Sequence, residues 1–298
     1  MFFLPSDFMF IPLLSVLSFI LHPSYFILTL GSLYGIVCAE FLLKGNIVED
    51  IEYSVMAAVE EQHWWYVGMR HIAQAWLDQL PVHRAWRALD AGCGTAGNVA
   101  YLLGDYGPAY GLDLMQAAVQ LGRKKTDAPL TQGSVLTLPY RDASFDLVTS
   151  FEVLYHRAVP DEVAALQEIY RVLKPGGWVL LRMPAYHWLY SAHDRSVHTR
   201  RRYTNKEVQQ LLRAADFTIE RSSYINSLLF PLILVQRLIE RIRPSAPTSD
   251  SAMQLPSRLA NKLFGAAMNF EARWLESGAG FPFGLSILTL AQKPNHSV

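Results

Sequence analysis

Residues 88–98 read ALDAGCGTAGN, and this segment lies between an apolar, strand-like run and a helical run that begins at Val99. The spacing Gly92-x-Gly94-x-x-Gly97 is typical of a turn whose backbone approaches a nucleotide closely, because glycine has no side chain in the way. The same spacing satisfies the fingerprint of dinucleotide-binding proteins. The segment therefore predicts an α/β domain with a ligand at the carboxyl end of its first strand.

Asp90 stands two residues before the first of these glycines, at the expected end of the strand. A carboxylate there lies close to any pyrophosphate bound at the helix N-terminus, and repulsion between like charges disfavours a dinucleotide. The same carboxylate suits a cationic ligand, for example the ammonium group of a methionine moiety. A nicotinamide-dependent oxidoreductase stays open as the alternative at this point.

The composition excludes several classes of protein. The chain has 298 residues, is 51% hydrophobic, and has 26 Lys and Arg against 26 Asp and Glu. Balanced charge gives no long-range field for attracting nucleic acid, so we expect no nucleic-acid partner. Two cysteines, Cys38 and Cys93, are too few for a disulfide framework or a cysteine-based zinc site. A reducing, cytoplasmic location is expected.

Residues 1–50 are predicted to form a hydrophobic segment that seeks a membrane. No Lys or Arg occurs before Lys44, and the apolar runs 8–21 and 25–43 are separated by a His-Pro pair. The second run approaches the roughly 20 residues that a spanning helix needs, so one crossing or a shallow helical hairpin would fit. A secretory signal is disfavoured because no basic residue precedes the apolar stretch. A buried cap helix is the structural alternative.

Beyond residue 50, apolar runs alternate with helical patterns, which favours a parallel sheet with crossover helices. Residues 51–80 read as a capping helical segment. Residues 228–283 are too long for a hairpin between the last two strands and predict a helical insertion, with one helix after Pro256. The inserted helices either cover the sheet or form a substrate lid or an interfacial membrane anchor. The expected strands are 86–90, 109–113, 130–134, 145–150, 178–183, 217–224 and 284–291.

Further motifs follow the glycine turn. Asp113 ends the second expected strand, residues 133–135 and 144–148 fit a third strand, a loop and a fourth strand, and residues 166–177 read LQEIYRVLKPGG. This set resembles the class I S-adenosylmethionine-dependent methyltransferases, in particular the type 11 group. The resemblance implies a Rossmann-like α/β fold over residues 51–293 and a tail at 294–298. Its sheet would be mainly parallel and seven-stranded, with an antiparallel last strand.

The resemblance also implies S-adenosylmethionine as the cofactor. Asp113 would accept both ribose hydroxyls, and Ser134 stands where many members have an aspartate that contacts the adenine. Ala96 occupies a common glycine position, where its methyl group would crowd the ligand if its φ were positive. The predicted cofactor-binding residues are Asp90, Gly92, Cys93, Gly94, Thr95, Gly97, Asp113, Leu114, Ser134, Val135, Phe151 and Arg70.

Arg70 follows Trp64 and Trp65 in the predicted capping segment. One interpretation is a lid over the cofactor, with Arg70 reaching the cofactor's carboxylate. The other is ordinary aromatic packing in the core.

Three histidines are candidates for a general base, because imidazole titrates near neutral pH. His156 follows the fourth expected strand and is the first choice, and His193 and His198 lie in the loop after the fifth. Each also has a structural interpretation, as a packing residue or as part of a solvated loop. The three arginines at 200–202 would suit an acceptor's phosphate or carboxylate. The histidines in this loop are irregularly spaced, so no metal site is expected.

The predicted reaction is methyl transfer to a small acceptor. Two hydrophobic additions frame the pocket, so the acceptor is expected to be apolar or amphiphilic: a lipid, an isoprenoid, or a quinone-like or polyketide-like compound, methylated on oxygen or carbon. Membrane association through the N-terminal segment is part of this prediction. The alternatives are an NAD(P)-binding oxidoreductase and a catalytically silent scaffold that keeps the methyltransferase fold.

Overall fold

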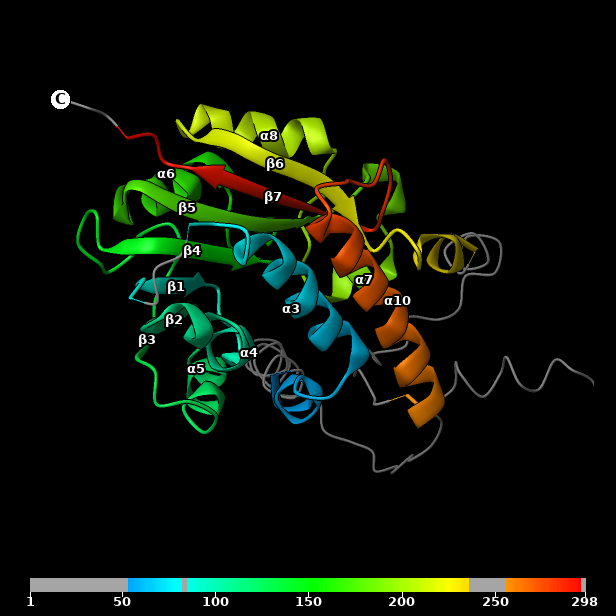
Figure 1. Ribbon diagram of the computed structural model, residues 1–298. Helices are drawn as coiled ribbons and strands as arrows, with labels where there is room; N and C mark the ends of the chain where they lie inside the picture. Colours follow the sequence, from blue (N-terminus) through cyan, green and yellow to red (C-terminus); the bar gives the residue numbers. More distant parts are fainter. Residues whose placement is uncertain (1–52, 82–84, 236–255, 296–298) are drawn as a thin grey trace, which may run out of the picture. The chain divides into compact units, whose positions relative to one another are not determined.

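Figure 1 shows a computed structural model of the chain, which describes residues 53–81, 85–235 and 256–295. The predicted membrane-seeking segment 1–50 lies outside the described residues, as do part of the predicted insertion and most of the tail. Among the helices in the described ranges, none combines the length and the apolar character needed to cross a bilayer. The predicted domain boundaries stay predictions.

A seven-stranded sheet forms the centre of the described part, with strand order β3-β2-β1-β4-β5-β7-β6. β7 pairs antiparallel with both β5 and β6, whereas the other neighbouring strands pair in parallel. The predicted class of fold, with its antiparallel last strand, is confirmed. The strands are β1 (Ala88–Ala91), β2 (Ala109–Asp113), β3 (Leu130–Gln132), β4 (Phe145–Phe151), β5 (Leu173–Pro184), β6 (Thr218–Ile225) and β7 (Ser286–Gln292).

All seven predicted strands are present, but some boundaries differ. β5 starts at Leu173 rather than at Trp178, because Leu173 already pairs with Phe145 of β4. The register shifts between Phe145 and Leu147, and this irregularity accommodates a glycine pair in which Gly176 has a φ of +76°. The two glycines therefore lie in a bulge within a longer strand.

The helices cover both faces of the sheet (Figure 1). Successive residues of β7 contact opposite layers: Leu288 and Leu290 face the cluster that includes α3, and Ile287 and Ala291 face the cluster that includes α6 and α8. Such two-sided burial explains why the strands read as continuous apolar runs. The helices are α3 (Trp64–Leu77), α4 (Gly97–Tyr101), α5 (Gln116–Gly122), α6 (Glu162–Val172), α7 (Ala192–Ser196), α8 (Asn205–Ala214) and α10 (Arg258–Glu276), with short 3-10 helices η1 (Leu103–Tyr106) and η2 (His187–Leu189). Residues 53–59 and 230–235 are also helical.

The helix predicted after Pro256 is α10, and it lies beside α3 (Figure 1). The rings of Trp64 and Phe264 are 5.0 Å apart, and Gly68 leaves room for the side chain of Met268. The two helices therefore run in the same direction, in close contact. Trp64, at the start of α3, therefore packs against α10, which supports its interpretation as a packing residue rather than as part of a lid.

Candidate functional site

The glycine turn lies at the carboxyl end of β1, where ligands bind in open α/β sheets. The amides of Gly92 and Cys93 both donate to the carbonyl oxygen of Leu112 in β2, at 2.7 and 2.8 Å. Gly92 has a φ of +92° and Gly94 a φ of +51°. A side chain on Gly92 would also overlap Val153, so the turn needs glycine there for two independent reasons.

Ala96 has a φ of +63°, the condition under which crowding of the ligand was expected. Its methyl group is instead fully buried and lies against Gly122 of α5. The left-handed conformation of an alanine costs about 1 kcal/mol. The methyl group of Ala96 therefore packs between the turn and α5 rather than on the ligand side of the turn.

Asp90 is completely buried below the turn. Its carboxylate accepts hydrogen bonds from the Thr149 hydroxyl at 2.7 Å and from the Asn98 amide at 3.3 Å. Burial raises the pKa of Asp90 to about 7, and these hydrogen bonds offset part of that rise. Burial therefore favours the protonated form of this carboxyl group, and a nearby cation would stabilise its ionised form.

Asp113, at the end of β2, fastens the turn to the second strand. Its two carboxylate oxygens accept hydrogen bonds from the amides of Gly94 at 2.8 Å and Met115 at 2.9 Å. Burial raises the pKa of Asp113, against the effect of these backbone amides. Each oxygen keeps a further lone pair, so the carboxylate can still accept hydrogen bonds from a ligand.

Residues 53–63 contribute a side chain that the sequence had not indicated. Glu60 is buried, accepts a hydrogen bond from the Thr95 hydroxyl at 2.6 Å and forms an ion pair with Lys125. Its carboxylate lies so close to Gly97 that a side chain there would overlap it. Arg70 donates to the main-chain carbonyl of Glu60 at 3.0 Å. Residues 53–63 thus close over the turn, and Arg70 holds them in place through this hydrogen bond.

The other predicted cofactor residues lie at the ends of β2, β3 and β4. Leu114 is exposed, Val135 is buried, and the Ser134 hydroxyl accepts a hydrogen bond from the amide of Leu136 at 3.2 Å. Phe151, at the end of β4, is buried. The structure therefore gathers these residues, together with the glycine turn, at the carboxyl edge of neighbouring parallel strands.

An ion pair beside Phe151 was missed by sequence reasoning. Arg182 of β5 donates from Nε to Glu152 at 2.9 Å, and its guanidinium lies 4.7 Å from the centre of the Phe151 ring. Glu152 has a φ of +61°, a strained conformation for a residue with a side chain. A charged residue inside an apolar strand was the available signal for Arg182, whereas the sequence contains no signal for the backbone of Glu152.

The three candidate histidines occupy different environments. The rings of His156 and His198 are 5.7 Å apart, edge to face, whereas His193 is exposed on α7. Burial lowers the pKa of His156, and His198 and Arg157 lower it further, so that this imidazole is neutral at pH 7. Its Nδ1 accepts a hydrogen bond from the amide of Ala158 at 3.1 Å. The neutral ring then has its proton on Nε2, which leaves no free lone pair for a base.

The three arginines at 200–202 pair with carboxylates of the protein itself, and their predicted contact with an acceptor stays a prediction. Arg200 and Arg201 pair with the buried Glu162 at 2.5 and 3.0 Å, and Arg202 pairs with Asp194 at 2.7 Å. The same loop supplies Thr204, which begins α8 with a capping box that Glu207 completes.

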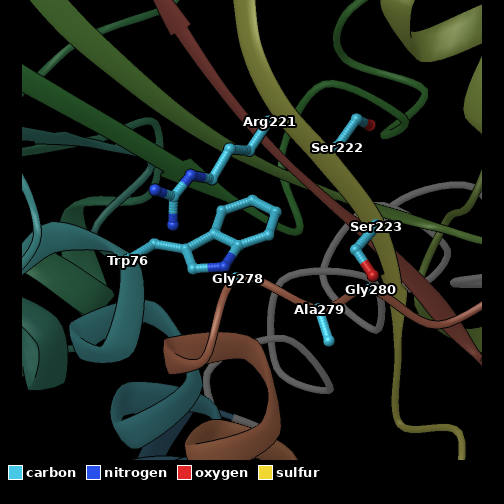
Figure 2. A pocket seen from close by; sticks show the side chains of 7 residues that line it. All are labelled: Trp76, Arg221, Ser222, Ser223, Gly278, Ala279 and Gly280. Carbon is cyan, nitrogen blue, oxygen red and sulfur yellow. The ribbon is translucent and has the colours of Figure 1, made fainter.

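A pocket elsewhere in the described structure lies between α3, β6 and the segment after α10 (Figure 2). Trp76, Arg221, Ser222, Ser223 and residues 278–280 line it, and its volume is about 180 Å³. None of the predicted site residues lines this pocket. Within the described residues, no cluster of His, Cys, Asp and Glu has the arrangement of a metal site.

Residues 89–181, from β1 into β5, match a methyltransferase domain family. The demethylmenaquinone methyltransferase of Staphylococcus epidermidis is 35% identical over 150 residues, which cover 46% of this chain and 59% of that protein. The enzyme of the same name from Geobacillus sp. (strain WCH70) is 36% identical over 113 residues, 35% of this chain and 47% of that protein. The chain thus spans about half the length of the curated relatives it matches.

Solved structures share the fold. A complex of the Trm112 methyltransferase activator with a methyltransferase, from Haloferax volcanii, gives a TM-score of 0.53 at 22% identity, covering 83% of this chain and 98% of that one. Geranyl diphosphate C-methyltransferase from Streptomyces coelicolor A3(2) gives 0.51 at 14% identity, covering 74% and 75%. The strand order and the glycine turn define a Rossmann-like α/β fold. Residues 89–181 thus match the methyltransferase family, and the described fold is the one that class I S-adenosylmethionine-dependent methyltransferases share; S-adenosylmethionine is the cofactor of that family.

Proposed function

We propose that this protein transfers a methyl group from S-adenosylmethionine to a small, apolar or amphiphilic acceptor of the quinone-like kind. The observation that carries the proposal is the buried carboxylate of Asp90 directly below the glycine turn. A ligand with an ammonium group and a sulfonium centre stabilises this carboxylate, whereas a pyrophosphate would be repelled by it. The cofactor supplies an activated methyl group, and the protein has to orient the acceptor and exclude water.

The class of acceptor rests on the relatives. Proteins named demethylmenaquinone methyltransferase are about 35% identical to this chain over the segments they share. The reduced, hydroquinone form of such a ring offers a hydroxyl oxygen and a ring carbon as nucleophiles, each losing a proton on methylation, so both O- and C-methylation fit. The labelling experiment described below would also detect the other acceptors predicted from the sequence, namely lipids, isoprenoids and polyketide-like compounds.

The histidine pair beside the end of β4 is our candidate for handling the acceptor's proton. His156 uses Nδ1 as a hydrogen-bond acceptor for the main chain, so it positions the loop and presents an Nε2–H donor. His198, with its ring 5.7 Å away, is the better candidate for the base. The exposed position of His193 on α7 makes it the weakest of the three predicted bases.

Two readings compete with this proposal: an NAD(P)-dependent oxidoreductase and a silent scaffold. Titration calorimetry of the full chain with S-adenosylhomocysteine and with NAD⁺ distinguishes the first, because only the sulfur nucleoside should bind. Incubation of cell extracts with isotopically labelled S-adenosylmethionine, followed by mass spectrometry of the apolar fraction, distinguishes the second. Binding of NAD⁺ alone, or a lack of labelled product in all fractions, would contradict the proposal.

Asp113→Ala provides the matched test of the cofactor site, with Asp105→Ala as its control. Asp113 accepts two backbone amides at the turn, whereas Asp105 is exposed in η1. Loss of the carboxylate that receives the ribose hydroxyls should weaken S-adenosylhomocysteine binding at least tenfold, or about 1.4 kcal/mol. The control should bind like the wild type. Equal affinities for the two variants would remove Asp113 from the site.

A further inference from the structure

The outer face of α10 carries four large apolar side chains at helical spacing. Leu259, Leu263, Phe270 and Trp274 expose 69%, 62%, 54% and 45% of their surfaces. The opposite face of the helix packs on α3 and includes the fully buried Met268. Packing on α3 therefore fixes the orientation in which the four outer residues, the apolar strip, face outward.

One edge of the apolar strip is basic. Arg258, Lys262 and Arg273 are exposed, and at 100° per residue they lie on the same side of the strip. Glu276 is an exposed acidic residue at the end of the helix, while Glu271 is buried and accepts hydrogen bonds from main-chain amides of residues 226 and 228. The exposed charge along α10 is therefore predominantly positive.

Aromatic contacts extend the apolar strip beyond the helix. The ring of Trp274 lies 6.1 Å from that of Phe281, and the half-exposed Phe283 lies 5.5 Å from Phe230. Phe230 starts the helical residues 230–235, in which Leu232 is 55% exposed. The exposed apolar surface thus continues from α10 through residues 281–283 to a second helical segment.

We propose that α10 docks on an anionic lipid surface, with the apolar strip at the boundary of the acyl chains and the basic edge on the headgroups. Leu, Phe and Trp on one face beside Lys and Arg are the composition of an interfacial helix. Monomeric soluble proteins rarely leave a large contiguous apolar patch uncovered. The basic edge is complementary to anionic headgroups, and in an antiparallel pair of two such faces the basic edges would lie side by side and repel, so the charge pattern favours an anionic partner. This inference does not depend on the proposed methyl transfer.

A site-specific label tests the proposal in the full chain. Ala266 is an exposed alanine amid the apolar strip, and Ala214 is an exposed alanine on α8. Each is replaced by Cys in a Cys38→Ser background and labelled with an environment-sensitive fluorophore, and the background protein alone is carried through as the labelling control. Vesicles of mixed phosphatidylglycerol and phosphatidylcholine should shift the emission of the label at 266 to the blue and leave the label at 214 unchanged.

The contribution of the basic edge is measured separately. Lys262→Gln with Arg273→Gln removes two charges beside the apolar strip, and Lys206→Gln with Arg213→Gln removes the same two charge types from α8. Each basic residue near an anionic surface strengthens binding about fivefold, so the first pair should weaken vesicle binding about 25-fold. The control pair should change it less than twofold.

Three results would overturn the proposal. The first is vesicle binding without a response of the label at 266, because another part of the chain would then make the contact. The second is a blue shift that depends on protein concentration in the absence of vesicles, because a second copy would then cover the apolar strip. The third is equal binding to vesicles of pure phosphatidylcholine. Calorimetry with S-adenosylhomocysteine on the same variants measures cofactor binding by itself, so a failure of the lipid proposal can be told apart from a failure of the cofactor proposal.

Discussion

The buried carboxylate of Asp90 should make cofactor affinity depend on pH. Its pKa is raised by burial to about 7, and the ammonium group of the ligand favours the ionised form. A group with a pKa of about 7 is about one tenth ionised at pH 6 and about nine tenths ionised at pH 8. Because the apparent affinity scales with the competent fraction, we expect it to rise about tenfold over this range.

Titration calorimetry of the wild type and of Asp90→Asn with S-adenosylhomocysteine, at intervals from pH 6 to pH 8, measures this effect. Asn at position 90 has nearly the same shape and retains an oxygen that accepts from Thr149, but it does not titrate in this range. The amine of the ligand titrates identically with both proteins. The ratio of the two affinities therefore isolates the ionisation of Asp90, and this ratio should rise about tenfold.

The stability of the unliganded protein gives an independent check. Because burial raises the pKa of Asp90, the fold favours the protonated form. Its contribution to the free energy of unfolding is fully present below the unfolded value of 3.8 and is lost as the pH rises through about 7. Wild type should therefore lose stability relative to Asp90→Asn between pH 4 and pH 8 in urea unfolding. If neither the affinity ratio nor the stability difference changes with pH, the assignment of Asp90 fails.

Three further predictions concern the turn, the loop and the base. Gly92→Ala should cost about 2–4 kcal/mol of stability in thermal unfolding, because the alanine would be strained at a positive φ and its methyl group would overlap Val153. Gly104→Ala is the control: this position has space for a methyl group, so the stability should change by no more than about 0.5 kcal/mol. Equal effects of the two substitutions would contradict the geometry. Burial alone would raise the pKa of Glu162, but hydrogen bonds from arginines and a tyrosine lower this pKa to about 2. The contribution of Glu162 to the free energy of unfolding is therefore present above pH 4.5 and is lost as the pH falls towards 2. In urea unfolding between pH 5 and pH 3, Glu162→Gln should lack this loss. His198→Gln should slow methyl transfer about 100-fold or more and His156→Asn less than tenfold, both with unchanged donor affinity; the reverse order would make His156 the base.

The sequence was sufficient to predict the sheet and the turn, because both depend on local patterns. Apolar runs buried on both faces show where the strands lie, and glycines at positive φ mark the turn at Gly92 and Gly94. Strand ends were less predictable. β5 begins at Leu173 only because Leu173 pairs with Phe145, and that pairing joins residues far apart in the chain.

Side-chain partners across the fold could not be predicted in this way. Arg201 lies 39 residues from Glu162, and its neighbours in sequence gave no sign that a buried carboxylate would engage it. A run of arginines looks the same whether it binds a ligand or completes a core. The contact of Glu60 with Thr95 likewise depends on how residues 53–63 return to the turn.

The electrostatic surroundings of the turn distinguish between the two kinds of ligand that its glycine spacing allows. Burial raises the pKa of the Cys93 thiol, and the carboxylates of Asp90, Asp113 and Glu60 raise it further. Three acidic groups therefore surround the turn, and Lys125 pairs with Glu60, one of the three. A pyrophosphate in this place would face the other two carboxyl groups at short range in a poorly solvated environment, where repulsion is strong whenever they are ionised, and ionisation would be disfavoured further. A ligand with a positive end meets the opposite situation, and so the arrangement selects a cationic nucleoside over a nicotinamide dinucleotide even though the glycine spacing admits both.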